Sequence, residues 1–380
     1  MTLLFKQIAT EFDYTFKKLG LMILFFVGFP FLAMWFTGVY NSEYVDDVPI
    51  AILDQDNSSL SREIAHYFNQ DERFRVTYEV SDQAEIQKLI DERKVYMGVC
   101  IPPHLADSIK AGQQTSILVL TDGTNMIISN NVYAGAATII QTVSAGVSIK
   151  VIEGKDAVIE DTAEHIALSF RFEERMLYDP KMTYMNYLIY GILAVVFQQL
   201  MLSAMATLLS RNPEEVAQKD TAIQIGAKII VAGLLLMISG GFAIFLMHTK
   251  FPLIYRGHVG TALLLTTLFA IAISAPGVWL FSITKKKTRF TQVAYMLSLP
   301  TFLTCGYVWP AEQMPILLRY AAKILWPLMN YARVFDEVMI KGLPFSTVIG
   351  NILGLILYSV IFLPLAIWYF KKQFQPKEIE

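Results

Sequence analysis

Six stretches of the sequence are apolar and contain no Asp, Glu, Lys or Arg. Each has about 18 residues or more, the length that an α-helix needs to cross roughly 30 Å of hydrocarbon. The stretches are residues 19–40, 183–209, 229–247, 259–283, 291–308 and 347–370. This pattern predicts a membrane α-helical protein with six transmembrane helices, the third to fifth within residues 228–308.

Basic residues mark one end of each stretch. Such ends lie in the cytoplasm according to the positive-inside rule. An even number of crossings then places both termini, including the tail 371–380, in the cytoplasm, and the long segment 41–182 outside. The flanking basic residues are Lys17, Lys18, Arg211, Lys228, Lys285, Lys286, Lys287, Arg289, Lys371 and Lys372.

Residues 1–18 have the pattern of an amphipathic helix. Apolar residues recur three and four positions apart, which aligns them on one face. We expect this helix to lie on the cytoplasmic membrane surface; the alternative is a simple extension of the first span. The apolar stripe is Phe5, Ile8, Phe12 and Phe16, and the other face carries Lys6, Gln7, Glu11 and Asp13.

Residues 41–182 differ from the spans, because charged residues are frequent and short apolar runs alternate with amphipathic segments. Strands are predicted at 48–53, 73–80, 95–101 and 117–121, and helices at 59–68, 82–91 and 104–110. From residue 130 to 175 the pattern is mostly helical. The alternation predicts an inserted α/β extracytoplasmic domain with a helical arm.

Asp54 and Asp56 follow the first predicted strand and allow two interpretations. Two carboxylates there would suit a metal ion or acid–base chemistry, whereas Asp after a strand commonly caps the next helix. We favour capping, because no His or third carboxylate recurs at ligand spacing.

Two connecting segments have distinctive patterns. Residues 210–227 are polar, and Pro213 with Glu214 and Glu215 predicts the first turn of a short cytoplasmic helix. That helix is either a handle on which a partner acts or an ordinary solvated connector. Residues 309–346 are apolar, proline-interrupted and too short for two crossings, which predicts a re-entrant hairpin on the outer side.

The composition supports a membrane protein and excludes several functional classes. Of the 380 residues 54% are hydrophobic and 17% charged, and the mean hydropathy is +0.44; a soluble domain carries roughly 25% charge. The net charge of −2 provides no field that would attract nucleic acid. Two distant cysteines, Cys100 and Cys305, exclude a disulfide framework and a cysteine metal site.

The sequence does not indicate ion coupling or ATP hydrolysis by this chain. Ion-coupled transporters usually carry ionisable side chains within their spans, whereas here only His248 lies at the edge of one. The chain also lacks the G-x-x-x-x-G-K-[ST] phosphate loop. If the protein moves a substrate, a separate chain must supply the energy, and we expect neither enzyme activity nor a bound cofactor.

Several motifs occur in a characteristic order. Residues 49–61 form a strand and an Asp- and Ser-rich turn, residues 98–103 end a strand in a double proline, and Tyr178-Asp179-Pro180 precedes the second span. The hairpin is marked by Gly306, Pro310, Pro315 and Pro327. In this order and with six spans, the chain resembles the permease subunit of ABC type-2 exporters over almost its whole length.

The resemblance implies a dimer of permease chains, either a homodimer or a paralogous heterodimer, in the bilayer of a bacterial plasma membrane. It also implies a cytoplasmic nucleotide-binding subunit that holds ATP and magnesium, and export of drugs, lipids or lipid-linked compounds. Whether a periplasmic adaptor joins the complex stays open. Segment 210–227 then becomes the coupling helix, although it lacks the family's Glu-x-Gly-Thr; the implied coupling residues are Arg211, Glu214, Glu215, Lys219 and Asp220.

Polar side chains within the spans are candidates for lining a transport path. Interhelical hydrogen bonding is the commoner use of such residues, so both interpretations stay open. With many aromatic and Met side chains, they fit an amphipathic cargo better than a sugar or a small ion. The candidates are Asn186, Gln198, Gln199, Ser298 and Asn351.

A second functional class also fits the pattern. The chain would then be a membrane-anchored assembly or receptor protein that binds a partner through residues 41–182. A neighbouring reading frame that encodes a Walker-type ATPase would favour export instead.

Overall fold

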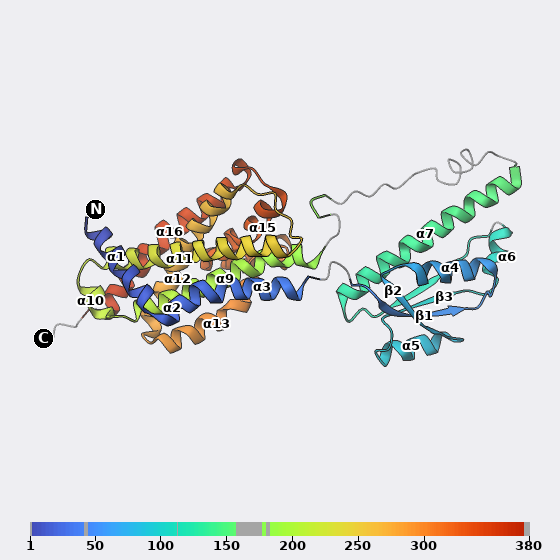
Figure 1. Ribbon diagram of the computed structural model, residues 1–380, viewed down its shortest axis with the longest axis horizontal. Coiled ribbons are helices and arrows are strands. Elements are labelled where there is room, and N and C mark those ends of the chain that lie inside the picture. Colours follow the sequence, from blue (N-terminus) through green and yellow to red (C-terminus); the bar gives the residue numbers. More distant parts are fainter. Residues whose placement is uncertain (1, 42–44, 112, 157–176, 180–182, 376–380) are drawn as a thin grey trace. The chain divides into compact units, whose positions relative to one another are not determined.

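A computed structural model of the chain describes residues 2–41, 45–111, 113–156, 177–179 and 183–375 (Figure 1). The chain forms two compact units. Met1–Glu43 and Met176–Glu380 form the membrane unit, and Tyr44–Arg175 form the α/β unit.

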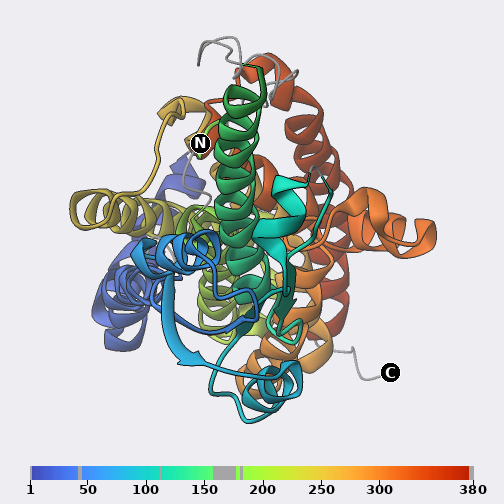
Figure 2. The ribbon, with the colours of Figure 1, turned by 90° about the vertical axis from the view of Figure 1, so that its right-hand side faces the viewer.

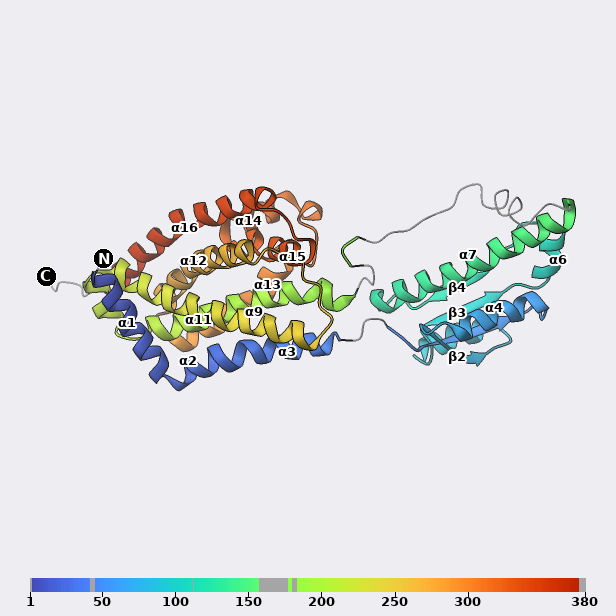
Figure 3. The same ribbon diagram turned by 45° about the horizontal axis from the view of Figure 1, so that its top comes forward.

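The membrane unit consists of helices packed around one apolar core (Figure 3). α9 is its central helix, because it is the most buried of the long apolar helices and packs against α3, α11, α12, α13 and α15. The helices are α1 (Thr2–Lys17), α2 (Leu19–Ile23), α3 (Phe29–Val39), α9 (Tyr184–Leu209), α10 (Pro213–Gln218), α11 (Thr221–Lys250), α12 (Val259–Thr284), α13 (Lys287–Leu303), α14 (Ile316–Leu325), α15 (Ala332–Lys341) and α16 (Phe345–Phe374).

A π-helical segment, Leu24–Gly28, joins α2 to α3 without a break in the helix. Within this segment the Phe25 carbonyl accepts a hydrogen bond from the Ser239 hydroxyl of α11. π-helical turns are rare and often occur at functional positions. Here the turn brings α2–α3 against α11 through a buried polar contact.

Six helical segments in the described part of the chain are long and apolar enough to cross a membrane. Five of them are α2–α3, α9, α11, α12 and α16, which fall on five of the predicted spans. The chain is therefore a mostly helical, multi-pass membrane protein.

The predicted span at 291–308 differs in the structure. α13 has 17 residues, begins with the charged Lys287, and ends at Leu303. At 1.5 Å per residue it extends about 25 Å, which is less than the roughly 30 Å of hydrocarbon. The helix stops because the chain turns at Gly306, whose φ is +80°, and folds the buried Tyr307 ring against Gly191 of α9.

The α/β unit is built on a four-stranded sheet with the order β2-β1-β3-β4. β1 (Val48–Asp54) is parallel to β2 (Phe74–Glu79) and β3 (Met97–Ile101), and β4 (Leu118–Thr121) is antiparallel to β3. The helices between them are α4 (Ser59–Gln70), α5 (Gln83–Asp91) and α6 (Leu105–Lys110). The predicted alternation of strands and helices is therefore confirmed for this segment.

The sheet is covered on both faces, because successive side chains of β1 point to opposite sides. Ile50 and Ile52 face a core shared with α4, whereas Ala51 and Leu53 face a second core shared with α5. α7 (Met126–Asp156) lies beside α4 and packs on the first core (Figure 2).

The sixth segment that is apolar enough to span a membrane, Met126–Lys150, lies within α7 of the α/β unit. The sequence pattern predicts that most of this segment belongs to the helical arm 130–175. In the structure, one stripe of the segment is buried in the first core of the α/β unit. Val132, Ala136 and Ile139 carry this contact. Its apolar character therefore reflects packing on the sheet.

The segment 309–346 folds as two short helices joined by tight turns. Pro310 and Pro315 each precede a helical turn, and Pro327 begins a 3-10 helix. α15 packs against α9, while α14 has no buried residue. These prolines lie where a missing N–H costs nothing, because the first turn of a helix has no partner for it.

Candidate functional site

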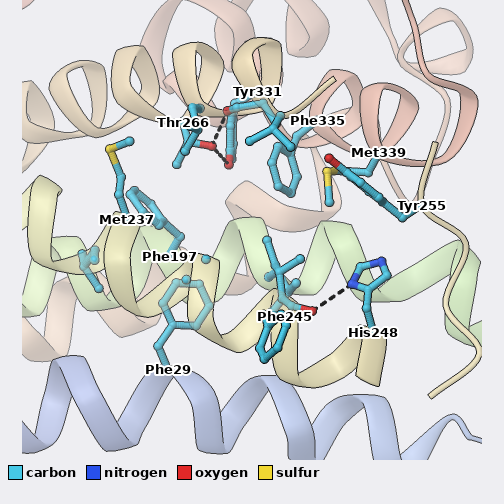
Figure 4. Close-up of a pocket in the computed structure, with 18 residues that line it drawn as sticks. Phe29, Phe197, Met237, Phe245, His248, Tyr255, Thr266, Tyr331, Phe335 and Met339 are labelled. Atoms are coloured by element: carbon cyan, nitrogen blue, oxygen red, sulfur yellow. Dashed lines mark hydrogen bonds between the residues drawn. The ribbon is translucent and has the colours of Figure 1, made fainter. Parts of the chain in front are cut away.

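The membrane unit contains a cavity of about 420 Å³ between α3, α9, α11, α12 and α15 (Figure 4). Small-molecule sites usually measure about 300–1,000 Å³. Its lining is almost entirely apolar, and an aromatic ring comes from each of four helices. These rings are Phe29 of α3, Phe197 of α9, Phe245 of α11 and Phe335 of α15.

Four polar side chains interrupt this lining, those of His248, Tyr255, Thr266 and Tyr331. The Tyr331 and Thr266 hydroxyls are 2.9 Å apart, and Thr266 donates to the Ala262 carbonyl of its own helix. Nδ1 of His248 lies 2.8 Å from the Ile244 carbonyl, which can only accept, so this nitrogen donates. These hydrogen bonds leave the cavity suited to binding an apolar ligand rather than to acid–base chemistry.

The His248 ring is held at both nitrogens. Its Nε2 lies 3.1 Å from the Tyr190 hydroxyl of α9, and the Ile254 carbonyl lies 2.9 Å from the same hydroxyl, so these two acceptors share its single proton. The Tyr255 ring packs edge-on against His248, with 5.3 Å between ring centroids. The end of α11 and the following loop are thereby fixed against α9.

The polar residues predicted to line a transport path do not line this cavity. Oε1 of Gln198 accepts from Nε1 of Trp326 at 2.7 Å, and Nε2 of Gln199 donates to the Ala294 carbonyl of α13 at 3.1 Å. Asn186 joins Asp179 to the Ile254 backbone. Ser298 and Asn351 are half-buried on α13 and α16. A role of these five residues in a path therefore stays a prediction.

The predicted coupling segment contains the short helix α10, and its two faces differ. Val216 and Ala217 are buried in the core of the membrane unit, whereas Glu214 and Glu215 are exposed. Asn212 donates to Glu215 at 3.0 Å. Lys219 and Asp220 are exposed in the turn that leads into α11. α10 packs against α16 and α11, so the exposed carboxylates sit on a firmly anchored turn.

A buried charge cluster lies next to this segment. The Lys228 ammonium is 2.7 Å from Oε1 of Glu11, and both side chains are at least 93% buried. The Arg211 guanidinium is 3.9 Å from the same oxygen and stacks on Tyr14. Oε2 of Glu11 has no hydrogen-bond partner among the described residues. The cluster joins α1, the start of the coupling segment and α11.

This cluster corrects one sequence interpretation. The sequence pattern puts Glu11 on the polar face of the surface helix 1–18, but the structure buries Glu11 against Lys228 of α11 and also buries Thr15, whereas Lys6 and Asp13 of the polar face stay exposed. Phe5 and Phe16 of the apolar stripe are exposed, while Ile8 and Phe12 pack against the core. Lys228 follows the start of α11 by seven residues, and this position of a cation inside an apolar helix was the available signal.

The structure also shows what Asp54 and Asp56, the candidate metal or acid–base residues, contact. Oδ1 of Asp54 accepts from the backbone of Asp56 and Asn57, and Oδ2 of Asp56 accepts from the Ala106 N–H at the start of α6. Ser58 caps α4. The carboxylates therefore serve the turn and a cap, and the described residues contain no cluster of three potential metal ligands.

Comparison with known proteins completes the description of the site. Residues 18–368 match the model of a family described as "ABC-2 family transporter protein". The "Inner membrane transport permease YhhJ" of Escherichia coli (strain K12) is 22% identical over 334 residues, which cover 85% of each chain. The "Probable multidrug ABC transporter permease YbhR" of the same organism is 19% identical over 306 residues, 78% of this chain and 79% of that protein.

Proposed function

Because this chain belongs to the ABC-2 family of transporter proteins, we propose that it is a permease that moves an amphipathic compound out of the cell. A separate ATPase subunit supplies the energy, and ATP and magnesium bind to that subunit. The lack of a phosphate loop in this sequence supports the division of labour.

The main support for the proposal is the structure of α10, which has one exposed acidic face and one buried apolar face. Its glutamates are exposed between two long apolar helices, and Val216 and Ala217 anchor the turn in the core. A force applied to Glu214 and Glu215 would move α9 and α11 together. Carboxylates at a helix start are well suited to accept hydrogen bonds from Arg or Lys of a docked subunit.

The apolar cavity supports the proposed class of cargo. A lining of aromatic and aliphatic side chains favours a hydrophobic or amphipathic molecule over a sugar or an ion. The name of the relative YbhR, a probable multidrug transporter permease, supports the same class. The candidate path residues on α9, α13 and α16 remain part of this proposal.

The membrane arrangement belongs to the proposal too. The basic residues at the helix ends favour both termini in the cytoplasm of a bacterial cell and the α/β unit outside. A second permease chain completes the transporter, and the α/β unit is the part that a periplasmic adaptor would bind if the complex uses one.

The test is reconstitution. The permease would be co-expressed with its proposed ATPase subunit, and ATP-dependent movement of fluorescent amphipathic dyes would be measured in proteoliposomes. Transport should require ATP and stop when the phosphate-loop Lys of the ATPase is replaced by Ala. The proposal would be contradicted if the permease alone bound ATP. It would also be contradicted if the rate of dye movement were the same with the Lys-to-Ala variant of the ATPase as with the wild type.

A further inference from the structure

The cavity in the membrane unit opens sideways between α11 and α12. Three of its lining residues are largely exposed: Phe245 on α11 is 63% exposed, and Val259 and Leu263 on α12 are 60% and 48% exposed. Both helices are apolar and long enough to cross a membrane. Exposed apolar side chains on such helices face lipid tails. The mouth of the cavity therefore faces the hydrocarbon of the bilayer.

Two adjacent glycines of α11 lie at the cavity wall, and only one of them borders open space. A Cβ on Gly240 would lie 2.9 Å from the Phe29 ring, so this position is already filled from α3. A Cβ on Gly241 would meet no atom within 4 Å. Gly241 thus borders open volume, and a larger side chain there would occupy the cavity without displacing protein atoms at its base.

One end of the cavity, at the last turn of α11, is polar, whereas the Thr266 and Tyr331 hydroxyls elsewhere in the lining are hydrogen-bonded to each other. His248 and Tyr255 lie together at this end (Figure 4). Both ring nitrogens of His248 are engaged by Ile244 and Tyr190. The Tyr255 ring is 41% exposed. Within the described residues, its hydroxyl makes no protein hydrogen bond. It is therefore available to the head of a ligand whose tail lies in the apolar part.

We propose that this cavity binds one hydrocarbon chain of a single-chain amphiphile that enters from the bilayer, with its head group at the Tyr255 hydroxyl. An apolar lining, a mouth towards lipid tails and one polar end match the two ends of such a molecule. Binding of the amphiphile requires neither an ATPase nor transport. The inference rests on the proposed function only where the bound molecule is regarded as the transported cargo.

The probe is a palmitic acid that carries a photoactivatable diazirine on its chain. The purified wild-type chain in lipid nanodiscs is irradiated with the probe, and labelled peptides are identified by mass spectrometry. Labelling should concentrate on peptides from α11 and α12 that border the cavity. An excess of unlabelled palmitic acid should abolish it.

Gly241→Phe fills the cavity and should lower saturable labelling more than about tenfold, because each lost buried methylene reduces affinity about fourfold. Gly350→Phe is the matched control, since a Cβ there also meets no atom within 4 Å but the residue lies on α16 away from the cavity. The control should label like the wild type. Leu263→Trp at the mouth repeats the test should Gly241→Phe fail to fold.

Tyr255→Phe keeps the ring and should weaken labelling by the acid about fivefold, the loss of one hydrogen bond. The inference is overturned if Gly241→Phe and Leu263→Trp, folded by their elution profiles, label like the wild type. It is also overturned if labelling spreads over the exposed faces of α16 and α12 alike and excess palmitic acid does not compete. Normal labelling with absent ATP-driven export would reject the proposed function and leave this site in place.

Discussion

The ammonium of Lys228 lies 2.7 Å from Oε1 of Glu11, although 217 positions separate the two residues. The pair ties the N-terminal helix α1 to α11 in a part of the membrane unit from which solvent is excluded. Arg211, two residues before α10, approaches the same carboxylate. One carboxyl group thus contacts basic side chains from two further segments of the membrane unit.

Glu11→Gln should destabilise the membrane unit by about 3–5 kcal/mol, because removal of one partner leaves the Lys228 charge buried and unpaired. A thermal unfolding curve of the purified chain in detergent measures this loss. The double variant Glu11→Met with Lys228→Met should recover most of it, since an apolar pair of similar size avoids the desolvation cost.

The exposed pair Asp13–Lys17 on the same helix is the control. Asp13→Asn should leave the unfolding temperature unchanged, because solvated ion pairs contribute little. If the double Met variant is no more stable than Glu11→Gln, an unpaired Lys228 charge is not the cause of the loss. The direct contacts of the Glu11 carboxylate with Lys228 and Arg211 would then hold α1 in place.

Glu214→Lys combined with Glu215→Lys should weaken docking of the ATPase subunit. If the carboxylates are paired at a desolvated interface, the loss is about 2–5 kcal/mol, enough to abolish co-purification. The measurement is the ratio of the two subunits after affinity purification, together with ATP hydrolysis. Both residues are exposed, so the amount of permease in the membrane should not change. Normal subunit ratios and normal hydrolysis would favour the solvated connector.

Cysteine labelling tests the orientation of the chain. A Cys at Gln113 should react with a membrane-impermeant maleimide in intact cells, and a Cys at Lys286 only after permeabilisation. Both positions are exposed, whereas the native Cys100 and Cys305 are buried and should remain silent. The reverse pattern would turn the proposed direction of transport around.

Gly135→Ala should loosen α7 on the sheet, whereas Gly146→Ala should not. A Cβ at residue 135 would lie 2.7 Å from Cζ of Phe74, a buried ring that packs on Phe68 and has little room to move. Overpacking of this kind costs about 1–3 kcal/mol. At residue 146 the added Cβ meets nothing within 4 Å and should stabilise the helix by about 0.5–1 kcal/mol.

Hydrogen–deuterium exchange of α7 peptides measures both changes, and the two variants should shift the rates in opposite directions. Faster exchange in both would mean that α7 is sensitive to any methyl group, and slower exchange in both would mean that it is not tightly packed on β2.

Features with a local cause could be predicted from the sequence. β1 is a short apolar run between polar residues, and α10 begins at Pro-Glu-Glu; both lie within a residue or two of their predicted places. The fold family was also recognisable, because the order of spans, strands and prolines extends over most of the chain.

Features that depend on contacts between distant segments could not be predicted. The uncharged run 291–308 continues past the end of α13, because a turn at Gly306 interrupts the helix without any charge to mark it. The Glu11–Lys228 pair joins two helices, and the sequence pattern of neither helix indicates that it packs against the other. The cavity is the space that five helices leave between them, and Gly241 becomes informative only once its neighbours are known.

The apolar character of α7 has a consequence for the synthesis of the protein. This helix is hydrophobic enough for the insertion machinery to take it as a span, and one extra crossing would invert every helix that follows. The four strands are made first, since β1 to β4 end at Thr121 and α7 starts at Met126. A sheet that has already folded can cover Val132, Ala136 and Ile139 as they emerge. Packing on the sheet is therefore the alternative to membrane insertion for this helix.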